Sequence, residues 1–79
     1  MDKQFTKVQG QYLAFIVAYT KLNRRAPAEA DFQRYFDVTP PSVHNMILTL
    51  ERYAFIKRTP GRARSIEIVL PVHEVPPLD

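Results

Sequence analysis

The chain has 79 residues, of which 46% are hydrophobic and 24% charged, with a formal net charge of +3 and no cysteine. This length suits one small domain, and the absence of cysteine excludes disulfides and thiolate metal sites. The longest apolar run, residues 12–19, is shorter than the roughly 20 residues that span a bilayer. We therefore expect a soluble, cytoplasmic protein with no membrane partner, basic enough for nucleic acid to be its partner.

A first helix is predicted from Thr6 to about Leu22. Thr6 and Gln9 fit a capping box, in which the threonine oxygen accepts from a backbone amide and the glutamine reaches back. Apolar residues at three- and four-residue spacing then predict one inward face: Val8, Tyr12, Phe15, Ile16 and Tyr19. Gly10 lies inside this helix and should cost about 0.5–1 kcal/mol relative to alanine.

A short second helix is predicted over residues 28–36, after Pro27. Phe32 and Phe36 lie four residues apart, so both should face inward. Asp37 is expected to take the turn position that follows, because aspartate tolerates left-handed backbone geometry better than most residues.

The third helix should begin at Thr39, a favoured N-cap residue, with Pro40 at its first position. Its inward stripe is predicted to be Val43, Met46, Ile47 and Leu50. The opposite face carries Pro41, Asn45, Leu48 and Arg52, flanked by Ser42 and His44.

Two strands are predicted at residues 55–59 and 65–70, joined by the turn signal Pro60-Gly61. Three helices followed by a hairpin predict an α+β, mostly α, winged helix-turn-helix fold over residues 1–70. The proline-rich residues 71–79 are predicted to be an extended or disordered tail that forms no helix.

Five runs carry a family resemblance: TKVQ at 6–9, APAEADF at 26–32, TPPSV at 39–43, LERYAFIKR at 50–58 and PGRARSI at 60–66. Together they resemble the N-terminal DNA-binding domain of LexA-type repressors. The resemblance implies that the third helix enters the major groove and the wing lies along the backbone. By position it implicates Thr39, Pro41, Ser42, His44, Asn45, Arg62 and Arg64. It does not extend to the family's C-terminal self-cleaving peptidase domain, so we expect no repressor cleavage.

Asn45 is the best candidate for reading a base, because a carboxamide can bond adenine N6 and N7 together. The alternative is an exposed polar residue on a solvated helix face. Leu48, on the same face, has three open interpretations: contact with a thymine methyl, contact with a partner protein, or an exposed leucine without a role.

Positive charge concentrates in the last part of the predicted domain. The charged residues between Glu51 and Glu67 are all basic: Arg52, Lys57, Arg58, Arg62 and Arg64. Arg62 and Arg64 are one residue apart and so should project to the same side of the hairpin, where they would grip phosphates or enter a narrow minor groove. The alternative is a solvated basic turn. About five neutralised phosphates would give a slope of log affinity against log salt near −4 to −5.

Catalysis is not expected. Ser42 and His44 point in different directions on a helix, and the sequence offers no acidic residue to orient the histidine. His44 and His73 are too few and too scattered for a metal site. We expect no enzyme activity, no cofactor, no metal and no small-molecule ligand.

The sequence therefore predicts a bacterial transcription regulator, a repressor, that binds double-stranded DNA at specific sites. A homodimer on half-sites about one helical turn apart would read enough base pairs. The alternative is a winged-helix module for protein–protein interaction, which would use Pro41, Leu48 and the proline-rich tail.

Overall fold

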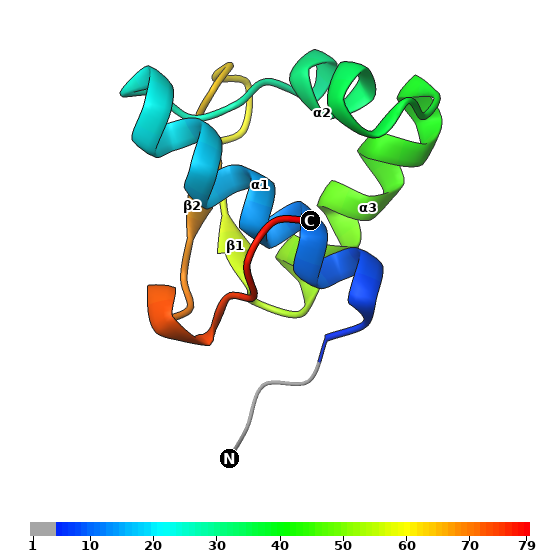
Figure 1. Cartoon of the computed structure of the whole chain (residues 1–79). Coiled ribbons are helices and arrows are strands. Elements are labelled where there is room, and N and C mark those ends of the chain that lie inside the picture. The colour runs from blue at the N-terminus through cyan, green and yellow to red at the C-terminus, as the bar shows by residue number, and fades with distance from the viewer. Residues whose placement is uncertain (1–4) are drawn as a thin grey trace.

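The computed structural model describes residues 5–79. Within this range three α-helices precede a two-stranded antiparallel sheet and one turn of 3-10 helix (Figure 1). The elements are α1 Lys7–Asn23, α2 Glu29–Phe36, α3 Pro40–Arg52, β1 Ile56–Lys57, β2 Glu67–Ile68 and η1 Val72–Glu74. Their order confirms the predicted winged helix-turn-helix fold. None of the described helices is long and apolar enough to cross a membrane.

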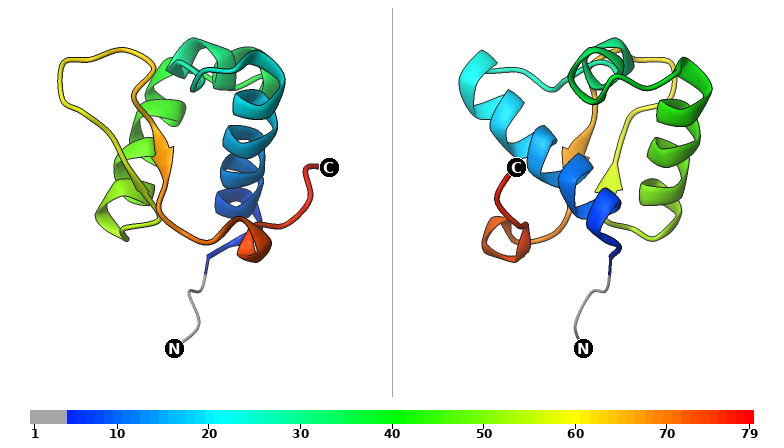
Figure 2. Two further views of the ribbon diagram at one scale, coloured as in Figure 1. Left: turned by 90° about the vertical axis from the view of Figure 1, so that its left-hand side faces the viewer. Right: turned by 45° about the vertical axis from the view of Figure 1, so that its right-hand side comes forward.

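The helices surround the hairpin. α1 and α3 lie on either side of it, and α2 runs across one end of the molecule (Figure 2). The first turn of α3 and the loop between the strands lie at that same end (Figures 1 and 2). The core fills the space between these elements, and its most deeply buried side chains are Leu13, Phe32, Val43, Ile47 and Leu50.

α1 begins with the predicted capping box. The Thr6 amide donates to Gln9 Oε1 (2.9 Å), and the Gln9 amide donates to Thr6 Oγ1 (3.1 Å). The helix ends where Arg24 adopts a left-handed conformation (φ 59°). The predicted inward face is wrong at Val8, which is 56% exposed. The buried residues instead run continuously from 12 to 16, because this part of α1 packs against both α2 and the core.

α2 begins one residue later than predicted, at Glu29, and its first turn is closed by Asp31, whose carboxylate accepts from the Ala28 amide (2.8 Å). Phe32 is fully buried, and Phe36 is partly buried and stacks on Tyr12 with ring centroids 4.6 Å apart. Asp37 takes the turn position with φ 55°, as predicted.

α3 begins as its sequence predicts. Thr39 is the N-cap and its Oγ1 accepts from the Ser42 amide (3.4 Å), while Pro40 occupies the first position. Three of the four inward residues, Val43, Ile47 and Leu50, are fully buried, each contributing about 1.5–3 kcal/mol. Met46 is only partly buried at the edge of the core.

The hairpin is much shorter than predicted. Its register pairs Ile56 with Ile68 and Lys57 with Glu67, and each strand has two residues. The loop between the strands turns twice, with left-handed φ at Gly61 (76°) and at Arg64 (56°). These turns end the pairing early, because a left-handed residue interrupts the alternation of a strand.

The prediction that the C-terminal tail forms no helix is wrong at residues 72–74. Residues 72–74 form η1, and the chain then returns along α1 (Figure 2). Gln11 Nε2 donates to the Pro77 carbonyl (3.0 Å), Gln11 Oε1 accepts from the Asp79 amide (2.8 Å), and Tyr35 Oη donates to the Asp79 carbonyl (3.0 Å). Proline excludes a long α-helix here but permits one 3-10 turn. The division into a domain of residues 1–70 and a tail of residues 71–79 stays a prediction.

Candidate nucleic-acid interface

The exposed side of α3 carries most of the predicted base-reading residues. Thr39, Pro41, Ser42, His44 and Asn45 are all exposed, while the buried stripe holds the opposite side of the helix in the core. The carboxamide of Asn45 makes no hydrogen bond to another residue of 5–79, so its donor and acceptor are available. Leu48 is partly buried rather than exposed. The protein-interaction alternative would therefore have to use a partly buried leucine and a tail that is hydrogen-bonded to α1 and α2.

Ser42 and His44 are held by neighbours that the sequence pattern did not connect. The Thr39 hydroxyl donates to Ser42 Oγ (3.0 Å), which ties both side chains to the helix cap. His44 Nδ1 lies 3.1 Å from Glu29 Oε2. The expectation that no acidic residue orients this histidine is therefore wrong. Glu29 is fifteen residues earlier in the chain, and only the packing of α2 on α3 brings the pair together.

The five basic residues between Glu51 and Glu67 divide into two groups. Arg52, Lys57 and Arg62 are exposed. Lys57 Nζ lies 3.9 Å from Glu67 Oε1 in an exposed pair, an arrangement that contributes only about 0–1 kcal/mol. Arg62 makes no ion pair with the acidic residues of the described range. Arg52 and Arg62 have no ion-pair partner in the described range, and the weak exposed pair of Lys57 can open, so all three cations can meet an anionic partner.

Arg58 belongs to the second group. Its Nε donates to Glu51 Oε1 (3.0 Å), its Nη1 lies 4.0 Å from Glu29 Oε2, and only 27% of its side chain is exposed. Glu29 therefore faces both His44 on α3 and Arg58 at the base of the loop. This acidic residue therefore lies beside both α3 and the base of the loop between the strands.

Arg64 is the other engaged cation. Its Nη1 donates to Tyr19 Oη (3.1 Å), to the Ala26 carbonyl (3.1 Å) and to Asp31 Oδ2 (3.0 Å). The prediction that Arg62 and Arg64 project to one side assumed a continuous strand. The left-handed turn at Arg64 breaks that alternation, and the Arg64 guanidinium contacts the helices.

Asp31 is the centre of this contact. Its side chain is 5% exposed, and it accepts from the Ala28 amide, from Arg34 and from Arg64. Burial alone raises the pKa of this carboxyl. The Ala28 amide, the positive charge of Arg64 and the Tyr19 and Arg34 contacts together outweigh burial and leave the Asp31 pKa below its usual range. The carboxylate is therefore charged and satisfied.

Sequence reasoning missed Asp31, Glu29 and Tyr19 as parts of the site. Asp31 could have been found in part, since an acidic residue three positions after a helix start signals capping. Nothing in the pattern indicated a partner 33 residues away. The same reasoning grouped Arg52 with the wing, yet α3 extends over 13 residues, which puts about 18 Å between its two ends. Arg52 lies at the end away from the wing loop.

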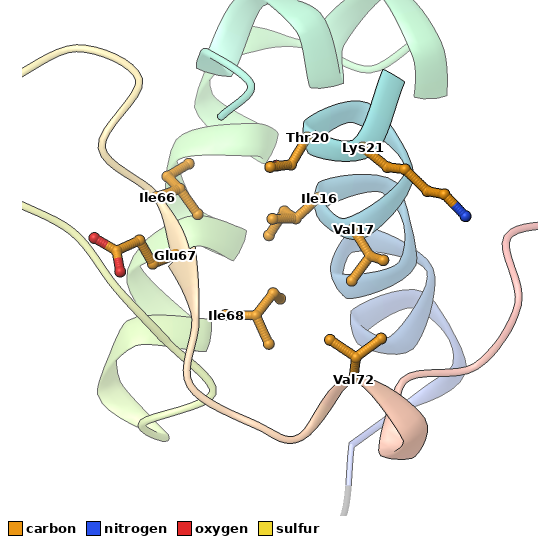
Figure 3. Close-up of a pocket in the computed structure, with 8 residues that line it drawn as sticks. All are labelled: Ile16, Val17, Thr20, Lys21, Ile66, Glu67, Ile68 and Val72. Atoms are coloured by element: carbon orange, nitrogen blue, oxygen red, sulfur yellow. The ribbon is translucent and has the colours of Figure 1, made fainter. Parts of the chain in front are cut away.

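A groove of about 350 Å³ lies between α1 and β2 (Figure 3). Ile16, Val17, Ile66, Ile68 and Val72 converge on it, whereas the charged ends of Lys21 and Glu67 point away (Figure 3). Thr20 is the one uncharged polar residue of this mostly apolar lining, which suits a phosphate poorly, so we leave the groove out of the candidate interface.

The sequence comparisons decide what kind of domain this is. The model of the LexA DNA binding domain family matches residues 2–65. The chain belongs to this family. This confirms the resemblance noted in the sequence. The match encloses α3 and the wing, from Thr39 to Arg64, and therefore every residue implicated above.

Full-length LexA repressors are similar to the chain over most of its length. One from Thermosipho africanus is 36% identical over 67 residues, which make up 85% of this chain and 34% of that protein. One from Thermosipho melanesiensis is 34% identical over 67 residues, with the same coverage of 85% and 34%. The chain thus spans about a third of the length of the curated relatives it matches.

Proposed function

We propose that this domain binds double-stranded DNA at specific sites and thereby represses transcription, in the cytoplasm where bacterial DNA lies. The observation that carries the proposal is the position of α3 within a LexA DNA-binding domain. Its capped first turns expose Thr39, Ser42 and Asn45, and the wing with Arg62 lies at the same end of the molecule. α3 would enter the major groove while the wing meets the backbone.

The two elements have different tasks in this proposal. Asn45 has a free carboxamide, the group that can bond adenine N6 and N7 together. Ser42 and His44 offer further polar contacts, although both already have protein partners. Arg62, Lys57 and Arg52 would neutralise phosphates, which gives affinity but no sequence information.

The salt dependence of binding follows from the number of free cations. With Arg58 and Arg64 paired inside the protein, three exposed cations remain in this segment. Three phosphate contacts give a slope of log affinity against log salt near −3 for each bound copy. This is shallower than the −4 to −5 expected when all five cations are counted.

A selection from random duplexes followed by fluorescence anisotropy tests the proposal. We expect an enriched motif, in which Asn45→Ala relaxes the preference at one base pair by about 1–3 kcal/mol. Arg62→Ala should weaken binding to all duplexes alike and flatten the salt slope by about 1. Failure of the wild-type domain to shift any duplex at low salt would refute the proposal.

The same selection tests for a dimer. One copy of α3 contacts few base pairs, so specific binding favours two copies on half-sites about 34–36 Å apart. The enriched sequence should then be a palindrome with a footprint of two copies. A single short motif occupied by one copy would contradict the dimer while leaving DNA binding intact.

A further inference from the structure

The loop that forms the wing cannot be held by its own strands. The hairpin has two residue pairs, and an isolated two-stranded hairpin is at best marginally stable in water. Inside the loop, the Thr59 amide donates to Ser65 Oγ (2.9 Å), while the Ser65 hydroxyl lies within hydrogen-bond distance of the Thr59 and Arg62 carbonyls (3.2 and 3.0 Å). These bonds shape the loop but do not attach it to the helices.

Arg64 makes that attachment. Throughout residues 5–79, Arg58 and Arg64 make the side-chain hydrogen bonds that join the segment between the strands to a helix or to the α1–α2 linker. Arg58 holds the base of the loop through Glu51, and the bonds from the rest of the loop, residues 59–65, come from Arg64. One guanidinium nitrogen thereby contacts the end of α1, the linker and the start of α2. The left-handed backbone at Arg64 is unfavourable for a residue with a Cβ, and it persists because these contacts hold it.

The acceptor at the centre of this contact is unusual in the molecule. Asp31 is the one buried charged residue of the described part of the chain. Its carboxylate already receives the Ala28 amide and Arg34. Moving Arg64 out to a phosphate would leave the buried carboxylate with only the exposed Arg34 and the Ala28 amide as partners, and losing one partner of a buried charge is unfavourable.

We propose that Arg64 is a positioning residue for DNA binding: it ties the wing to the helices through Asp31, Tyr19 and the Ala26 carbonyl, and so places Arg62 against the backbone without contacting DNA itself. This inference rests on the proposed function. Arg62 is exposed and without an ion-pair partner in residues 5–79, two residues from this anchor, so its position depends on how the loop is fixed.

The DNA affinity of Asp31→Asn distinguishes an effect of wing position from an effect of net charge. Removal of one negative charge would raise DNA affinity if only net charge mattered. If the carboxylate fixes the wing, the variant should instead bind at least threefold more weakly, although its net charge is more positive. Glu67→Gln is the matched control, because Glu67 is exposed on β2 and has only a distant partner in Lys57. It should leave affinity unchanged or raise it.

A double-mutant cycle tests the link to Arg62 directly. We expect Arg62→Ala to weaken duplex binding at least fivefold in the wild-type chain and less than twofold in an Arg64→Ala chain, because the wing is already displaced there. Arg64→Lys keeps the charge on one nitrogen but has a side chain one bond shorter, so it should reach the three acceptors only in part and give an effect between those of wild type and Arg64→Ala. If the effects of the two alanine variants multiply, Arg64 contacts DNA independently and the inference is wrong.

Hydrogen exchange in the absence of DNA gives a second readout. The Thr59 amide should exchange at least tenfold faster in Arg64→Ala and in Asp31→Asn, and at the wild-type rate in Arg62→Ala. Equal protection in all variants would overturn the inference even where DNA binding is intact. Wild-type protein that binds no duplex would instead contradict the proposed function, and the exchange result would still show whether Arg64 fixes the wing.

Discussion

Replacing Gly10 by alanine tests whether the C-terminal tail packs on α1 in solution. A Cβ at Gly10 would lie 3.0 Å from Pro76 Cγ and 3.1 Å from Phe5 Cε1. Carbon contacts are ordinarily about 3.5–4.0 Å, so both neighbours must move, and overpacking of this kind costs about 1–3 kcal/mol. Alanine gains about 0.8–1 kcal/mol over glycine inside a helix. We therefore expect the variant to lose up to about 2 kcal/mol of unfolding free energy.

A double-mutant cycle with Pro76→Ala assigns that cost to the tail. Pro76→Ala removes the nearest atom, so Gly10→Ala should be less harmful in this background by about 0.5–2 kcal/mol. Gly61→Ala is the control, because its φ of 76° is strained for alanine while no atom lies within 4 Å. It should cost about 1–2 kcal/mol with or without Pro76. Urea and thermal unfolding followed by circular dichroism measure all these variants. An equal effect of Gly10→Ala with and without Pro76 would refute the packed tail.

Three further variants test the local structure of the site. Thr39→Ala should lower the unfolding free energy by about 0.5–2 kcal/mol through loss of the α3 cap, and an unchanged urea midpoint would contradict this role. Asp31 has a lowered pKa, so it stabilises the fold above the ordinary aspartate pKa of about 3.9 and loses this contribution as pH falls through its lower folded pKa. At pH 7 the unfolding free energy of Asp31→Asn should be about 1–3 kcal/mol lower than that of wild type, and this difference should shrink toward pH 2. Urea titrations that show the same difference at every pH would disprove this role of Asp31. Ser65→Ala should speed hydrogen exchange at the Thr59 amide while leaving the helices protected, whereas slow exchange there would rule out the loop bond.

The features that could be predicted from the sequence are those fixed by near neighbours in the chain. The capping box at Thr6, the cap at Thr39 and the left-handed Asp37 each depend on bonds or backbone preferences within about four residues. The buried stripe of α3 follows from helical periodicity in the same way. The order of these elements was enough to predict the winged fold, because few arrangements accommodate three short helices and a hairpin.

The features that the sequence did not reveal depend on contacts between distant segments. The Arg64–Asp31 pair spans 33 residues and the bond from Gln11 to Pro77 spans 66. Nothing local marks an arginine as paired or free, so all five cations of the segment looked equally available. The tail has the composition of a linker, yet Val75 and Leu78 are partly buried and pack against the core formed by the helices.

The small size of the domain explains why charged residues take structural roles in it. A chain of 79 residues buries limited apolar surface, and its core ends at the base of the hairpin, where Ile56 and Ile66 are buried. The loop beyond, with Pro60 and Gly61 exposed at its turn, has no apolar residue to anchor it. The long side chain of Arg64 can still connect that loop to the helices, through its ion pair with the buried carboxylate of Asp31. The consequence for function is that part of the positive charge sets the geometry of the wing, and only the remainder is available to attract DNA. Affinity then depends on placement of a few exposed cations more than on the net charge of the segment.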